Sequence, residues 1–303
     1  MRTQLKLVFL LACVGWMQPV VVCAQQAPAK SLIADNAKLK LVADDYKFTE
    51  GPAVDRQGNV FFTDQPNDRI LKWSADGKIE TWLTPCGRCN GLFFEPHGNL
   101  IGCADEQNQL WSFAPDKSHT VLLDGIDGKR FNGPNDVWVD ADGTLYFTDP
   151  YYKRPYWDRE VMEAQVPKRV YRLASDGKTL TVAAESFKQP NGIVGDAANR
   201  ILYVADIGDN KTYRFRINGD GELIDRQLFC EMGSDGMTLD VLGNVYLTGR
   251  GVTVFDHDGH KLQEIDVPEN WTANVCFGGQ ERKTLFITAS DSVYTLEMNV
   301  QGL

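Results

Sequence analysis

No proline-, glycine- or serine-rich linker and no low-complexity run divides the 303 residues of this chain. With 43% apolar residues, the sequence can form one large core. The length alone does not require two domains, because barrels and propellers commonly exceed the usual domain size. We therefore expect a single folded domain.

Basic residues are also scarce, with 31 Lys and Arg against 41 Asp and Glu and a formal net charge of −10. An acidic surface repels phosphate groups, which excludes nucleic acid and anionic membranes as partners and suits a protein that holds a cation. Cys86 and Cys89 have no second cysteine pair or histidine at zinc-ligand spacing, so a zinc motif is not expected there. No obligate protein partner is indicated.

Long apolar runs are missing except at the amino terminus, where one extends from Leu7 to Val22. It is too short and too interrupted for a membrane span, and it ends in the small-residue site Val22-Cys23-Ala24. Residues 1–24 are therefore predicted to be a signal peptide, and residues 25–37 a disordered leader. The expected location is periplasmic or extracellular. Lipidation at Cys13 is a less favoured alternative.

Five cysteines would remain after cleavage: Cys86, Cys89, Cys103, Cys230 and Cys276. In an oxidising compartment, one disulfide among the first three is consistent with this set. Cys276 lies inside an apolar strand and is expected to be a buried core residue.

The sequence does contain a long internal repeat. Six times, an oxygen-bearing residue stands 14 to 16 positions before the end of a short apolar strand. The six leading residues are Glu50, Asn90, Asn135, Asn191, Asp235 and Asn274. The strand ends are Asp64, Asp105, Asp149, Asp206, Gly249 and Ser290, and they advance by 41 to 57 residues. A period of this length built from short strands is typical of propeller blades.

Each repeat contains four strand-like segments separated by turn residues, and the last repeat ends after its third. Leu39 to Val42 matches the missing fourth strand, and closing the ring with it would leave no unpaired edge. The sequence therefore predicts an all-β, six-bladed propeller over residues 38–303, with an N-terminal strand completing the last blade.

Antiparallel order within each blade would bring the six leading residues to one end of the central channel, called the top here. The insertion Pro150–Lys168 would lie on the same face, and its tyrosines and Trp157 suit either a pocket wall or a packed surface loop. The four histidines would lie in or near the bottom turns. Asp64, Asp149 and Asp206 are expected to cap loops rather than bind a metal.

A ring of carboxylate and amide oxygens without His or Cys suits Ca²⁺ or Mg²⁺. An isolated Asn-Gly is usually only a turn, because both residues tolerate left-handed conformations. Six leading oxygens in register, two of them acidic, favour a site over six unrelated turns.

Several motifs resemble the regucalcin/gluconolactonase family: EGPAV at Glu50, RFNGPNDVWVDADGTLYFTDPYY at Asn135, QPNGIV at Asn191 and SDGMTLDVLGNVYLTG at Asp235. The resemblance extends from about Leu39 to the C-terminus. It implies a secreted lactonase with a divalent metal in the channel, usually Ca²⁺, with Mg²⁺, Mn²⁺ or Zn²⁺ as alternatives.

Carried onto this chain, the resemblance makes Glu50, Asn135, Asn191 and Asp235 the metal ligands and Asp235 the catalytic base. Asn90, Asn132, Asn274 and Tyr151 are the candidate substrate-binding residues. Asp136 is a candidate for orienting its neighbour. The implied substrate is a sugar lactone or another small lactone, opened by water to the hydroxy acid.

Two other functions remain open on the sequence. Calcium-dependent phosphotriesterases have a similar propeller and metal set, and a non-catalytic propeller could use the metal only as a brace. Strictosidine-synthase-like relatives also show that the fold need not hydrolyse lactones. Paraoxonase-type chemistry requires a histidine dyad, which the positions of the four histidines disfavour.

Overall fold

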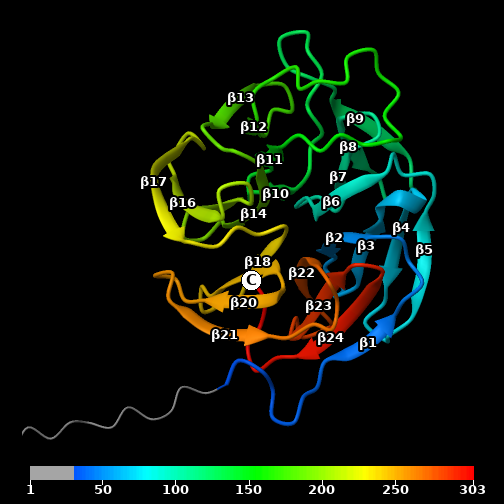
Figure 1. The fold of residues 1–303 in the computed structure, drawn as a ribbon, viewed down its shortest axis with the longest axis vertical. Helices are drawn as coiled ribbons and strands as arrows, with labels where there is room; N and C mark the ends of the chain where they lie inside the picture. Colours follow the sequence, from blue (N-terminus) through cyan, green and yellow to red (C-terminus); the bar gives the residue numbers. More distant parts are fainter. Residues whose placement is uncertain (1–30) are drawn as a thin grey trace, which may run out of the picture. The chain divides into compact units, whose positions relative to one another are not determined.

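Six antiparallel four-stranded sheets surround a central axis in the computed structural model, which describes residues 31–303 (Figure 1). The predicted six-bladed β-propeller is confirmed. Within residues 31–303, no helix has the length and apolar character needed to cross a membrane.

The strands of each blade are numbered from the centre outward. The first blade contains β2 (Thr49–Val54), β3 (Val60–Asp64), β4 (Arg69–Trp73) and β5 (Ile79–Leu83), with the short helix η1 (Gln65–Asn67) after β3. The second contains β6 (Cys89–Phe94), β7 (Leu100–Ala104), β8 (Gln109–Phe113) and β9 (His119–Leu123). The third contains β10 (Val137–Val139), β11 (Leu145–Asp149), β12 (Arg169–Leu173) and β13 (Leu180–Ala184).

The remaining blades follow the same order. The fourth contains β14 (Pro190–Asp196), β15 (Ile201–Asp206), β16 (Lys211–Ile217) and β17 (Leu223–Cys230). The fifth contains β18 (Met237–Leu239), β19 (Val245–Gly249), β20 (Gly251–Phe255) and β21 (Lys261–Ile265). The sixth contains β22 (Thr272–Gly278), β23 (Thr284–Ala289), β24 (Ser292–Glu297) and β1 (Lys40–Ala43).

The N-terminal strand closes the ring as predicted. β1 pairs antiparallel with β24, with Leu41 opposite Tyr294. The chain already packs against the core of the sixth blade at Leu32 and Ile33, before the predicted start of the domain at residue 38. The ring is therefore completed by strands from the two ends of the described chain.

The apolar cores lie between neighbouring blades. Every residue of β3, β7, β11 and β19 is buried, because these second strands are covered on both faces. Phe62 and Phe286, with ring centroids 5.4 Å apart, join the first and sixth blades. This double-sided burial explains why the second strands are continuous apolar runs in the sequence.

The described cysteines are all buried free thiols, so the disulfide considered among Cys86, Cys89 and Cys103 is not formed. The prediction that Cys276 is a buried core residue is confirmed.

Carboxylate-capped turns at the bottom connect the inner strands to the second strands. Oδ1 of Asp55 accepts hydrogen bonds from the amides of Gln57 and Asn59, both at 2.9 Å. Asp240 accepts equivalent bonds from Leu242 and Asn244 in the fifth blade. These turns reverse the chain and leave the beginning of each inner strand at the top.

Candidate active site

The six leading residues all lie at the beginning of an inner segment. Glu50, Asn90, Asn191 and Asn274 lie within β2, β6, β14 and β22. Asn135 and Asp235 lie just before β10 and β18, so the inner strands of the third and fifth blades start later than the repeat predicts.

Glycines allow these residues to approach one another around the axis. A Cβ would come within 2.1 Å of the Asn90 carbonyl oxygen at Gly51, 2.6 Å of the Asn135 carbonyl oxygen at Gly91, 2.8 Å of the Asp235 carbonyl oxygen at Gly192 and 1.9 Å of the Asn274 side chain at Gly236. Each of these glycines follows one leading residue and touches the leading residue of the next blade. Only a residue without a side chain fits at such a contact.

Asn191 and Asp235 form the direct side-chain contact of this ring. Nδ2 of Asn191 donates to Oδ1 of Asp235 at 2.7 Å and to the hydroxyl of Tyr152 at 2.9 Å. Nε1 of Trp271 donates to Oδ2 of Asp235 at 2.6 Å. Both carboxylate oxygens are therefore held in place. Burial raises the pKa of Asp235, although these hydrogen bonds act to lower it.

Glu50 supplies a second carboxylate to the same region. It is 3% exposed, and its side chain accepts one hydrogen bond, from the amide of Gly51 at 2.9 Å. Burial raises the pKa of Glu50 well above its usual range, and the negative charges of Asp235 and Asp136 add to the effect. Two neighbouring carboxylates with so few donors would be stabilised by a cation.

Asn135 and Asp136 connect three blades at the ring. The carbonyl oxygen of Asn135 accepts the amide of Gly91 at 2.7 Å. The Asp136 carboxylate accepts the amides of Val137 at 3.0 Å and Ile193 at 3.3 Å, and burial raises its pKa to about 7. Asp136 thus positions the backbone beside Asn135 and Asn191 rather than presenting a free carboxylate.

One amide oxygen of the ring has no partner. Oδ1 of Asn191 is buried and accepts no hydrogen bond from any described residue. Within residues 31–303, no three His, Cys, Asp or Glu side chains form a cluster that could hold a metal ion, so a metal here would depend on amide oxygens as well as Glu50 and Asp235. An orphaned amide oxygen beside two carboxylates fits a hard divalent cation.

The predicted substrate-binding residues separate into two groups. Asn90 and Asn274 belong to the ring, where Oδ1 of Asn274 accepts the amide of Val275 at 2.8 Å. Asn132 and Tyr151 instead stabilise the insertion. Nδ2 of Asn132 donates to the carbonyl oxygen of Val166 at 3.0 Å, and the hydroxyl of Tyr151 donates to that of Met162. Asn132 is fully buried, so the structure does not bring its side chain into the ring.

The expected loop-capping role of three aspartates is confirmed. The carboxylates of Asp64, Asp149 and Asp206 each accept the amides of two consecutive residues that lead into the blade. These residues are Lys47 and Phe48 for Asp64, Asn132 and Gly133 for Asp149, and Lys188 and Gln189 for Asp206. The four histidines lie in or beside the bottom turns, as predicted.

Sequence reasoning did not identify Trp271 and did not distinguish Tyr152 and Arg154 from the rest of the insertion. Tyr152 and Trp271 contact the ring through Asn191 and Asp235. The position of Trp271, three residues before Asn274, was the available signal for it. Nothing in the repeat pattern separates Tyr152 from the neighbouring tyrosines.

A cavity of about 780 Å³ occupies the bottom part of the channel. It reaches from Asp136 and Asn274 to the turns at Asp55 and Asp140. Glu50, Asn191 and Asp235 do not line it, so the ring and this cavity are separate parts of the channel.

Comparison with known proteins assigns the family. The family model described as SMP-30/Gluconolactonase/LRE-like region matches residues 48–291. The chain belongs to this family. A gluconolactonase of Zymomonas mobilis is 27% identical over 91% of this chain and 86% of its own length.

Solved structures agree with this assignment. A gluconolactonase of Xanthomonas campestris superposes with a TM-score of 0.82 and 29% identity, covering 88% of this chain and 91% of that one. A calcium-binding regucalcin of Agrobacterium tumefaciens has a TM-score of 0.73 and 18% identity over 88% of this chain and 96% of its own, which shows the shared fold.

Proposed function

We propose that this protein is a secreted, divalent-metal-dependent lactonase that opens a sugar lactone or a similar small lactone to its hydroxy acid. Family membership and the similarity to gluconolactonases support lactone hydrolysis. The observation that carries the proposal is the buried, unpartnered Oδ1 of Asn191 beside the carboxylates of Glu50 and Asp235.

Glu50, Asn191, Asp235 and Asn135 would hold the metal. A bound divalent cation would act as a Lewis acid toward the lactone carbonyl. The proposed ion is Ca²⁺, because the donors are carboxylate and amide oxygens and because regucalcin, a protein of the same fold, binds calcium.

Asp235 is the proposed general base. Its carboxylate is fixed by Asn191 and Trp271, which leaves remaining lone pairs to receive a proton from the attacking water. The hydroxyl group of that water then bonds to the acyl carbon, the bond to the ring oxygen breaks, and Asp235 returns the proton to that oxygen. The products are a carboxylic acid and an alcohol in one hydroxy acid.

The proposed secretion depends on residues 1–24 as a signal peptide, and these lie outside the described residues. Fractionation of cells that express the full chain tests it, with mature protein beginning near residue 25 as the expected product.

The activity is tested with chelator-stripped full-length protein and a pH-indicator assay over aldonolactones and aliphatic lactones. Ca²⁺, Mg²⁺, Mn²⁺ and Zn²⁺ are added back separately. We expect turnover that disappears on stripping and returns with metal while the β-sheet circular dichroism spectrum is retained. A fluorophosphate hydrolysed in place of every lactone would favour the phosphotriesterase alternative, and metal binding without any turnover would favour a binding propeller.

A further inference from the structure

Asp105 breaks the capping pattern of the blades. In the first, third and fourth blades, the carboxylate at the end of the second strand accepts backbone amides of the chain leading into that blade. In the second blade, the corresponding amide of Arg88 donates instead to Asp68 at 2.7 Å. The side chain of Asp105 is therefore free to bind other groups.

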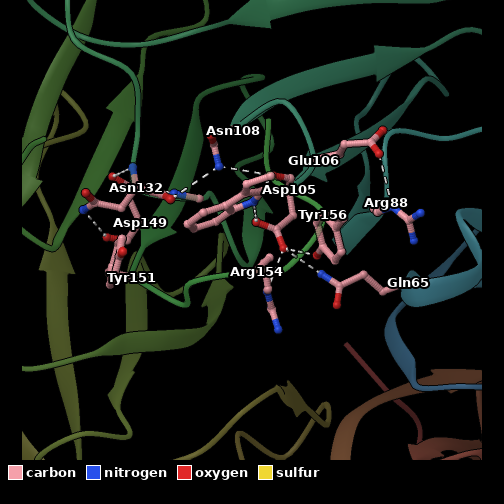
Figure 2. A network of polar contacts seen from close by, with 12 residues as sticks. Gln65, Arg88, Asp105, Glu106, Asn108, Asn132, Asp149, Tyr151, Arg154 and Tyr156 are labelled. Carbon is pink, nitrogen blue, oxygen red and sulfur yellow. Dashed lines mark hydrogen bonds and ion pairs between the residues drawn. The ribbon is translucent and has the colours of Figure 1, made fainter. Parts of the chain in front are cut away.

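Asp105 uses this freedom to hold the insertion. Its Oδ2 accepts hydrogen bonds from Nε of Arg154 at 2.9 Å and the hydroxyl of Tyr156 at 2.6 Å. Nε2 of Gln65, from the first blade, donates to the same oxygen at 3.1 Å, and Nε1 of Trp157 donates to Oδ1 at 3.2 Å (Figure 2). Asp105 is 4% exposed, so a single buried carboxylate fixes three side chains of the insertion. This contact set favours a built pocket wall over a loosely packed surface loop.

Arg154 keeps most of its hydrogen-bonding capacity unused. Its Nε is bonded to Asp105, and its two Nη groups donate to no other residue within 31–303. The Arg154 side chain is 26% exposed, so solvent or a ligand can reach it. An arginine anchored through Nε presents its outer edge as a rigid pair of donors.

Arg154 also lies close to the ring. Its guanidinium is 5.4 Å from the centre of the Tyr152 ring, and the Tyr152 hydroxyl contacts Asn191 at 2.9 Å. The positive charge of Arg154 acts to lower the pKa of Glu50 and of Asp235. A substrate that reaches these ring residues would therefore have part of its body beside Arg154.

We propose that Arg154, positioned by Asp105, binds a negatively charged substituent on the lactone. The proposal rests on the lactonase function proposed above and names the substrate class of that site. Two parallel N–H donors on a planar guanidinium match the paired oxygens of a carboxylate, sulfonate or phosphate. Such an oxyanion would take the donors that the protein itself leaves unpaired, while a neutral lactone would leave them to water.

The test compares glucono-δ-lactone with the same lactone carrying a 6-phosphate, 6-sulfonate or 6-carboxylate group, using the metal-loaded full chain. The variants are Arg154→Gln and Arg154→Lys, with Lys153→Gln as the control that removes an adjacent exposed charge. For at least one anionic lactone we expect a lower KM than for the neutral one. Arg154→Gln should raise that KM by about 10- to 100-fold, with kcat nearly unchanged. Arg154→Lys should show an intermediate loss, and Lys153→Gln almost none.

Three outcomes would overturn the proposal: a wild-type preference for the neutral lactone, an equal loss for neutral and anionic lactones in Arg154→Gln, or a matching loss of Ca²⁺ affinity measured by calorimetry. If no lactone is opened at all, the proposed function fails on its own. Calorimetric binding of 6-phosphogluconate against gluconate, with and without Arg154, then still decides the role of Arg154.

Discussion

The side-chain amide of Asn191 bridges the fourth and fifth blades by donating to Oδ1 of Asp235 at 2.7 Å. This bond fixes the amide so that its oxygen, Oδ1, is the atom left without a partner. Trp271 holds the other oxygen of Asp235. Two side chains that the chain places 44 positions apart are thereby oriented as one unit with an open acceptor.

Replacing Asp235 by Asn separates metal binding from proton transfer. The amide keeps an oxygen for the metal but cannot act as a base, so we expect kcat to fall by about 100-fold or more. Much of the metal affinity should remain. Steady-state kinetics and Ca²⁺ calorimetry measure the two effects separately. Unchanged turnover would reject Asp235 as the base.

Replacing Asn191 by Asp introduces a third carboxylate next to Asp235 and Glu50. Without metal, repulsion between the carboxylates should lower the melting temperature below that of the wild-type protein. Added Ca²⁺ should raise the melting temperature of the variant more than that of the wild type, because the cation relieves this repulsion. Differential scanning fluorimetry with and without Ca²⁺ checks both expectations, and equal shifts in the two proteins would contradict a cation at this position.

Replacing Gly51 by Ala tests the close packing of neighbouring blades. Gly51 has φ +41°, and its added Cβ would lie 2.1 Å from the Asn90 carbonyl oxygen. Gly77 offers a matched control, because it has φ +92° with no atom within 4 Å of an added Cβ. We expect Gly77→Ala to cost about 1 kcal/mol from backbone strain and Gly51→Ala about 3 kcal/mol or more.

Urea unfolding of the two glycine variants gives both values under the same conditions. The difference between them isolates the contact between the first and second blades from the left-handed backbone strain. Equal losses of stability would show that the ring tolerates a side chain at Gly51.

The blade repeat and the leading residues were predictable because both depend on local patterns. A buried second strand such as VFFTD at 60–64 is a continuous apolar run, and Glu50 stands at a fixed spacing before it. The role of Asp105 was not predictable in this way, because it depends on Arg154 and Tyr156, which reach it across 49 and 51 positions. The same holds for Trp271 on Asp235, and for Asn132, whose partner Val166 lies inside the insertion.

The buried cysteines should not react with thiol reagents in the folded protein. Burial raises the pKa of Cys230 to about 11 and that of Cys276 to about 12, so at pH 8 both remain protonated thiols. Protonated thiols are poor nucleophiles. Ellman's reagent at pH 8 should find almost no reactive thiol in native protein without residues 1–24, and five per chain after denaturation. Fewer than five after denaturation would indicate a disulfide.

The pairing of β1 with β24 should contribute strongly to stability, and Leu41 is the position at which to test it. Leu41 lies opposite Tyr294 and is 48% exposed, so a change there affects the strand pairing more than the core. Proline cannot donate a backbone hydrogen bond and restricts φ, whereas alanine keeps the backbone intact. We expect Leu41→Pro to lower the melting temperature clearly and Leu41→Ala to lower it only slightly. The proline variant should also aggregate more readily, because a released β1 leaves β24 as an unpaired edge. Similar melting temperatures for the two variants would mean that the ring is stable without this closing strand.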